Sequence, residues 1–62
     1  MKVLYGEKIW CFDEELSVEE LLEKINIEKE EVIVLANGKK LECNDSISSE
    51  ASVLIVENAR GG

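Results

Sequence analysis

The segment from residue 16 to residue 25 contains the strongest local signal in the chain, and it predicts a helix. Ser17 and Glu20 have the spacing of a capping box, in which each side chain bonds the backbone N–H of the other residue. Leu16 and Leu21 have the spacing of the hydrophobic staple that often accompanies this cap. The apolar residues of the segment recur at the period of one helical face: Val18, Leu21, Leu22 and Ile25.

This helix is predicted to run from Val18 to Ile25 or Asn26, with Lys24 placed to pair with Glu20 one turn earlier. A helix of this length is marginal in water by itself and needs a partner that covers its apolar face. The chain has 62 residues, which is enough for one small domain. We therefore expect the helix to pack on a sheet formed by the rest of the chain.

A glycine-containing turn near the start predicts a first β-hairpin. Gly6-Glu7 separates the strand Lys2–Tyr5 from the strand Lys8–Phe12, and glycine supplies the positive φ that such a turn needs. A two-residue loop at this point places Leu4 opposite Ile9, which puts both side chains on the same face of the sheet.

A second hairpin is predicted around Asn37-Gly38, the strongest short hairpin signal. It joins the apolar strand Glu31–Ala36 to the short strand Lys39–Glu42. The polar segment Cys43–Ala51 is predicted to be a loop with room for one helical turn, and Ser52–Glu57 is predicted to be the last strand.

The predicted order of elements is β-β-α-β-β-β, in which the first and last strands can pair in parallel through a crossover. This order indicates an α+β fold with a mixed sheet of four to five strands and one helix packed on one face. Such an arrangement is the β-grasp, or ubiquitin-like, fold. Residues 1–57 are expected to form the folded domain, and residues 58–62 are expected to form a flexible tail.

The side of the sheet away from the helix is predicted to be apolar. Residues 32–35 and 53–56 are apolar at every position, whereas a sheet face that is open to water usually carries polar residues at alternate positions. We expect a partner-binding surface on this side, formed by Leu4, Ile9, Ile33, Leu35, Leu54 and Val56. The alternative is that the alternation slips, or that segment 43–51 covers part of the surface.

Composition argues against several classes of function. The chain has 14 acidic and 7 basic residues and a net charge of −7, which opposes binding to nucleic acid or to an anionic membrane. That charge suits a basic protein partner, or serves solubility alone. There is no histidine, and Cys11 and Cys43 are not spaced as metal ligands, so no metal site is expected and both are interpreted as half-buried thiols. Without a signal peptide or a long apolar stretch, the expected location is the cytoplasm.

The two last residues, Gly61 and Gly62, are the candidate reactive end of the chain. Residues without side chains can enter a narrow channel, and a terminal carboxylate reacts with a nucleophile only after activation, as by adenylation with ATP and Mg²⁺. The sequence contains no phosphate-binding loop that could supply this activation. We therefore expect a carrier that is the substrate of a separate activating enzyme, with no catalytic residue and no bound cofactor of its own.

Three segments carry a resemblance to known proteins: the opening Met1–Glu7, the helix entry Leu16–Lys24 and the ending Arg60-Gly61-Gly62. Together they resemble the ThiS/MoaD family of sulfur carriers and, more distantly, ubiquitin. MoaD-like chains are usually longer, so the length favours the thiamine-type branch over the molybdopterin-type branch.

The resemblance implies a cycle in which a MoeB/ThiF-type activating enzyme adenylates Gly62. A sulfur donor then converts Gly62 to a thiocarboxylate, and a downstream synthase accepts the sulfur for thiamine-type or molybdopterin biosynthesis or for tRNA thiolation. Gly61 and Arg60 would belong to the tail that contacts the activating enzyme. Two other functions stay open: a ubiquitin-like modifier joined through its Gly-Gly end to lysines of target proteins, and a plain interaction module.

Overall fold

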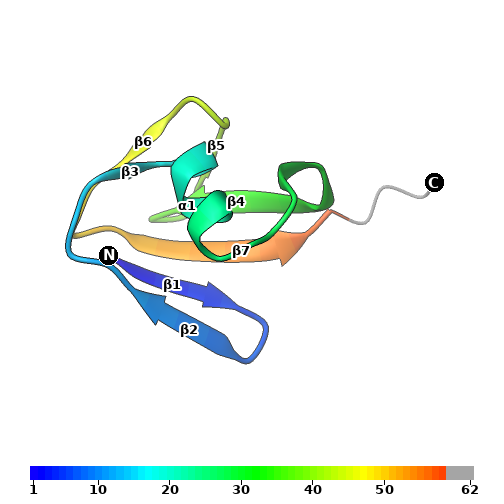
Figure 1. Cartoon of the computed structure of the whole chain (residues 1–62), viewed down its shortest axis with the longest axis horizontal. Helices are drawn as coiled ribbons and strands as arrows, with labels where there is room; N and C mark the ends of the chain where they lie inside the picture. The colour runs from blue at the N-terminus through cyan, green and yellow to red at the C-terminus, as the bar shows by residue number, and fades with distance from the viewer. Residues whose placement is uncertain (59–62) are drawn as a thin grey trace.

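The computed structural model describes residues 1–58 and is an α+β structure with one α-helix and a mixed five-stranded sheet (Figure 1). The strands of this sheet lie in the order β2-β1-β7-β4-β5, and β3 and β6 form a separate two-stranded ladder. In chain order the elements are β1 (Lys2–Tyr5), β2 (Lys8–Cys11), β3 (Leu16–Ser17), α1 (Val18–Lys24), the 3-10 helix η1 (Lys29–Glu31), β4 (Val32–Ala36), β5 (Lys39–Leu41), β6 (Ser46–Ile47) and β7 (Ser52–Glu57).

Both predicted hairpins are confirmed, and so is the register of the first one. Leu4 lies opposite Ile9 in the antiparallel pair of β1 and β2. Gly6 has φ +60°, as the first position of this turn requires. At the second hairpin, Asn37 and Gly38 both have positive φ, 53° and 84°, which is the geometry of a type I′ turn.

The predicted parallel pairing of the first and last strands is also confirmed. β7 lies between β1, with which it is parallel, and β4, with which it is antiparallel. The register places Leu4 beside Leu54 and Leu54 beside Leu35. β7 is therefore the central strand, and it joins the two hairpins into one sheet.

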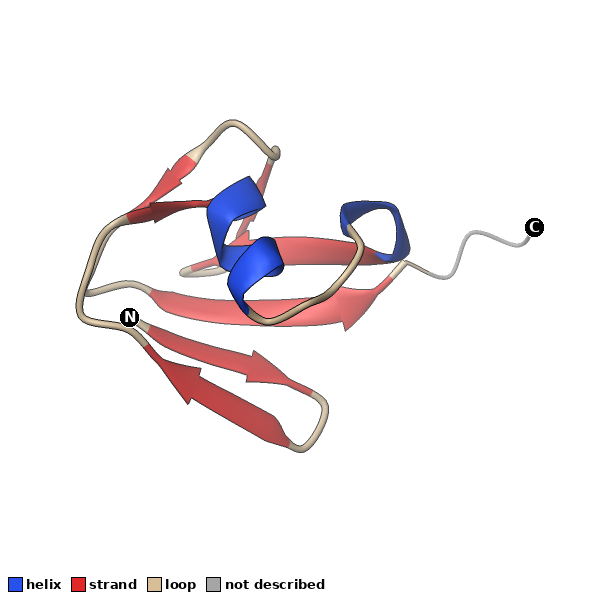
Figure 2. Cartoon of the chain, in the orientation of Figure 1, coloured by secondary structure: helices blue, strands red, loops and turns tan. Residues whose placement is uncertain are grey.

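α1 lies over one face of this sheet (Figure 2), and the core is formed by side chains of the helix and of that face. The predicted apolar stripe of the helix points into it, with Val18, Leu21 and Leu22 buried and Ile25 packed against the cluster. On the sheet side, residues of β1, β4 and β7 alternate between buried and more exposed positions. The buried core consists of Val3, Leu16, Val18, Leu21, Leu22, Val32, Val34, Ile47, Ala51, Val53 and Ile55.

The helix ends at Lys24, slightly before the predicted end. Asn26 follows in the left-handed conformation, with φ 62°, which asparagine tolerates better than most residues. The Asn26 N–H donates to the carbonyl of Glu23, and the Ile27 N–H donates to the carbonyl of Leu22. These two bonds form a Schellman motif, which satisfies carbonyl groups that the helix end leaves unpaired.

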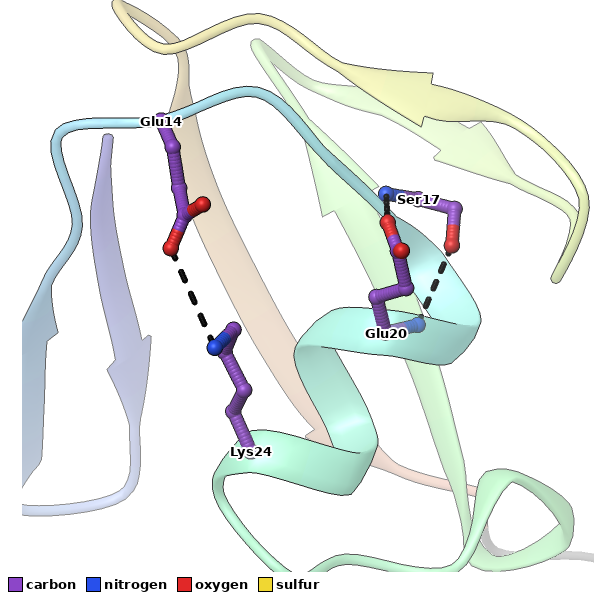
Figure 3. Close-up of polar contacts among 4 residues, drawn as sticks. All are labelled: Glu14, Ser17, Glu20 and Lys24. Carbon is purple, nitrogen blue, oxygen red and sulfur yellow. Dashed lines mark hydrogen bonds and ion pairs between the residues drawn. The ribbon is translucent and has the colours of Figure 1, made fainter.

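The N-terminus of α1 has the predicted capping box (Figure 3). The Ser17 Oγ accepts from the Glu20 N–H at 3.1 Å, and the Ser17 N–H donates to the Glu20 Oε1 at 3.0 Å. The predicted pair of Lys24 with Glu20 is wrong. The Lys24 Nζ lies 3.8 Å from the Glu14 Oε2 instead, because the Glu20 carboxylate is turned back toward the cap.

Segment 43–51 differs from its prediction as a loop. It contains β6, which pairs antiparallel with β3, so the predicted order β-β-α-β-β-β lacks two short strands. Ile47 pairs with Leu16 in this ladder and is only 1% exposed. The segment therefore packs with the helix side of the molecule, and its one isoleucine belongs to the core.

Several predicted strand ends are wrong by one residue, and local hydrogen bonds explain two of the differences. β5 ends at Leu41 because the Glu42 N–H donates to the Asp45 Oδ2 at 2.7 Å and leaves the ladder. β4 begins at Val32 because Glu31 belongs to η1, in which its N–H donates to the carbonyl of Glu28. β2 ends at Cys11, although the Phe12 N–H still donates to the carbonyl of Met1.

We predict that Ser17→Ala lowers the free energy of unfolding by about 1 kcal/mol, since it removes the side-chain acceptor for a helical N–H. Glu23→Ala is the control, because Glu23 is exposed on the same helix and outside the capping box, and we expect a change within about 0.5 kcal/mol. Urea unfolding followed by circular dichroism measures both. Equal losses for the two variants would contradict the role of the cap.

We also predict that Ile47→Ala lowers the free energy of unfolding by about 2–5 kcal/mol, because it leaves a cavity in the core. The matched substitution Ile9→Ala removes the same atoms from a side chain that is 58% exposed, and we expect less than about 1 kcal/mol. If Ile47→Ala does not fold, Ile47→Val should still cost about 0.5–1.5 kcal/mol in the same urea titration. Similar losses at both positions would show that Ile47 is not packed in the core.

Candidate functional site

The sheet face opposite α1 is apolar, and we call it the open face. It consists of Leu4, Ile9, Ile33, Leu35, Leu54 and Val56. The strand register lines four of these residues up across the sheet, in the order Ile9, Leu4, Leu54 and Leu35. Ile33 and Val56 form a second cross-strand pair next to this row. Six side chains from four strands thus form one continuous surface.

The predicted alternation between the two sides of the sheet is confirmed. On β7, Val53 and Ile55 are buried against the helix, whereas Leu54 is 44% exposed. Leu4 is 37% exposed and Ile9 is 58% exposed, and the other three members of the open face are half-buried. The alternative in which segment 43–51 covers this surface does not hold for Leu4, Ile9 and Leu54.

The open face continues into a shallow hollow at the end of β1. There β1 turns away at Gly6, while β7 extends to Glu57. The hollow is lined by Tyr5, Gly6, Glu7, Lys8, Leu54, Ile55, Val56 and Glu57. Leu54 and Val56 belong to both surfaces, so the open face meets this hollow, which also has the charged residues Glu7, Lys8 and Glu57 in its lining.

The candidate reactive residues Arg60, Gly61 and Gly62 lie outside the described residues, so their predicted roles stay predictions. The last residue that the structure describes is Asn58, whose N–H donates to the carbonyl of Glu31 at 2.9 Å. This bond continues the pairing of β7 with β4 by one residue beyond the strand. The direction in which the chain leaves the sheet is thereby fixed up to Asn58.

Two lysines lie on the same side of the sheet as the open face, and the sequence analysis did not identify them. Lys2 precedes Leu4 by two residues on β1, and Lys40 lies opposite Leu35 in the pair of β4 and β5. Both are exposed. The register that placed Leu4 opposite Ile9 also puts Lys2 on that face, so this signal was present in the sequence.

The acidic residues are concentrated in a different part of the chain. Nine of the fourteen acidic residues lie between Asp13 and Glu31, together with two lysines. The remaining residues contain five acidic and five basic side chains. The net charge therefore belongs to the segment that contains α1 and η1 and its flanking loops.

The helix N-terminus offers no free N–H group to an anion, and within residues 1–58 the cysteines belong to no cluster of metal ligands. The first backbone N–H groups of α1 donate to the carbonyls of Asp45 and Cys43 and to the Ser17 Oγ, so they are not available to an anion. Within residues 1–58 there is no cluster of His, Cys, Asp and Glu that could hold a metal ion. Cys43 is half-buried as predicted, but Cys11 is exposed on the open-face side of β2, which corrects its interpretation as half-buried.

Comparison with known proteins gives no assignment. No protein-family model matches the chain, and no curated protein matches it. In the part of the chain that the structure describes, no helix has the length and apolarity needed to cross a membrane.

We predict that Cys11 reacts faster than Cys43 with a thiol reagent such as iodoacetamide, because only Cys11 is exposed. The variants Cys43→Ser and Cys11→Ser isolate the two thiols, and mass spectrometry measures the rate of each. Equal rates in the folded protein would contradict the exposure of this side of β2. Denaturation in urea should make the two rates similar, which serves as the control.

Proposed function

We propose that this chain is a β-grasp sulfur carrier of the ThiS/MoaD type, in which Gly62 is the residue that carries sulfur. The α+β architecture supports the proposal, since a mixed five-stranded sheet with one helix on one face is compatible with a β-grasp. The proposed chemistry requires that Gly62 carries the free terminal carboxylate. The cell compartment that we propose is the cytoplasm.

One observation carries the proposal. β7 is the central strand, contributes Leu54 and Val56 to the open face, and leads directly into the last residues of the chain. A carrier needs a folded body that its enzymes recognise and a chain end that reaches their active sites. In this molecule β7 contributes to the apolar surface, and Gly61 and Gly62 follow its last residue, Glu57, by four and five positions in the sequence.

The chemistry that we propose needs no reactive side chain in the carrier. On the activating enzyme, the carboxylate of Gly62 attacks the α-phosphorus of ATP and releases pyrophosphate, with Mg²⁺ bound by the enzyme and the nucleotide. A persulfide on the sulfur donor then attacks the acyl carbon and expels AMP. A second thiol breaks the resulting S–S bond as it forms a disulfide with the donor cysteine, and Gly62 is left as a thiocarboxylate for a sulfur-accepting synthase.

We predict a mass gain of about 16 units when the chain is incubated with ATP, Mg²⁺, a MoeB/ThiF-type activating enzyme, a persulfide donor and a thiol. The gain corresponds to the replacement of one carboxyl oxygen by sulfur, and intact mass spectrometry measures it. The variant without Gly62 should show no gain.

The control for the enzyme is a known carrier that the same preparation converts. If that carrier gains sulfur and this chain does not, the sulfur-carrier function is wrong. Conjugates of higher mass on a blot of cell extract, lost when Gly61 and Gly62 are deleted, would instead support a ubiquitin-like modifier. Unchanged function after the same deletion would support a plain interaction module.

A further inference from the structure

We infer that the partner of the open face is a protein surface with an apolar centre and a border of carboxylates. This inference rests on the proposed function and specifies the surface of the activating enzyme that binds the carrier. It differs from the expectation drawn from the net charge alone, which favours a basic partner. The position of the charges, rather than their sum, decides between the two.

The open-face side of the strands carries positive charge only. Among the strand positions of residues 1–58 on this side, the charged residues are Lys2 and Lys40. The remaining positions are Leu4, Ile9, Cys11, Ile33, Leu35, Ser52, Leu54 and Val56. Glu57 and Lys8 have the strand parity of the buried residues, so they belong to the opposite side, and they line the hollow at the end of β1 together with Glu7.

The two lysines border the apolar row on different sides. Lys40 lies next to Leu35, at the β5 end of the row that begins with Ile9. Lys2 lies in the next cross-strand row, between Cys11 and Ser52. Charged groups at the rim of an apolar contact select partners and steer their approach more than they add affinity. Carboxylates on the partner are the complement of this rim.

The same distribution of charge argues against two other occupants of the open face, a basic protein and a second copy of this chain. A basic partner is attracted to the segment between Asp13 and Glu31, which carries most of the acidic residues and includes the helix on the opposite side of the sheet. A second copy of this chain offers Lys2 and Lys40 again, and its own open-face strand positions supply no carboxylate to meet them. A partner surface that is apolar and has an acidic border fits both the apolar row of the open face and the two lysines beside it, Lys2 and Lys40.

The test compares two double variants that change the net charge by the same amount. Lys2→Glu with Lys40→Glu reverses the rim of the open face, whereas Lys24→Glu with Lys29→Glu reverses two exposed lysines of the helix-side segment. The dissociation constant of each for a MoeB/ThiF-type activating enzyme is measured by isothermal titration without ATP, at low and at high salt. Urea unfolding of each variant confirms that it is folded.

We expect the Lys2→Glu with Lys40→Glu variant, the rim variant, to bind the enzyme roughly tenfold more weakly than the wild type at low salt, because its reversed charges meet like charges. The difference in affinity should be smaller at high salt, which screens these charges. The helix-side variant should stay within about twofold of the wild type. In a Cys43→Ser background, bound enzyme should slow the alkylation of Cys11, since that thiol lies on the covered side.

Four results would overturn the inference. Equal affinities for both double variants, in a chain that gains sulfur, would refute the acidic border and leave the proposed function intact. Weaker binding of a Glu19→Lys with Glu23→Lys variant, but not of the rim variant, would place the contact on the helix side. A stable dimer that protects Cys11 without enzyme, measured by sedimentation, would make a second copy the occupant. A chain that neither binds nor gains sulfur refutes both proposals.

Discussion

The pairing of β7 with β1 and β4 is the interaction on which the rest of this structure depends. The two hairpins, β1–β2 and β4–β5, each form from neighbouring residues, and a single two-stranded hairpin is marginally stable in water. β7 lies between them and turns two hairpins into one five-stranded sheet. Its core-facing residues Val53 and Ile55 are accordingly almost fully buried, at 2% and 1% exposure. The parallel pair with β1 joins the beginning of the chain to its end, so this contact must overcome the entropy of closing most of the chain into a loop.

The path of the chain between the hairpins explains why one face of the sheet stays uncovered. The connection from β2 to β4 contains β3, α1 and η1, and β6 returns to pair with β3 on the helix side. Both connections therefore cover the same face, and within residues 1–58 neither of them covers Leu4, Ile9 and Leu54 on the open face. Because the acidic residues are concentrated in the first of these connections, the fold also separates charge from apolar surface. The like charges of that connection are thus kept away from the surface that a partner can cover.

The features that sequence reasoning predicted correctly are local or follow from simple alternation. Gly6, Asn37 and the pair of Ser17 with Glu20 act over two to four positions, and each has the conformation or bond that its type favours. The features it missed depend on contacts between distant segments. Ile47 stands alone among serines, so no periodicity reveals that it is buried against Leu16. The pair of Lys24 with Glu14 requires knowledge of where the loop before the helix lies. The predicted role of Gly62 lies outside the described residues and stays a prediction.

The position of β7 before the end of the chain also limits where the proposed chemistry can take place. Gly62 follows Val56 by six residues, and an extended chain spans at most about 3.3–3.6 Å per residue. Any active site that acts on Gly62 while a partner covers the open face must therefore lie within roughly 20 Å of Val56. A partner that holds the open face raises the effective concentration of the chain end at a site within this radius, as in other linked binding events. Under the proposed function, recognition at the open face and reaction at Gly62 are then coupled through β7, which contributes Leu54 and Val56 to that face and precedes Gly62 in the sequence.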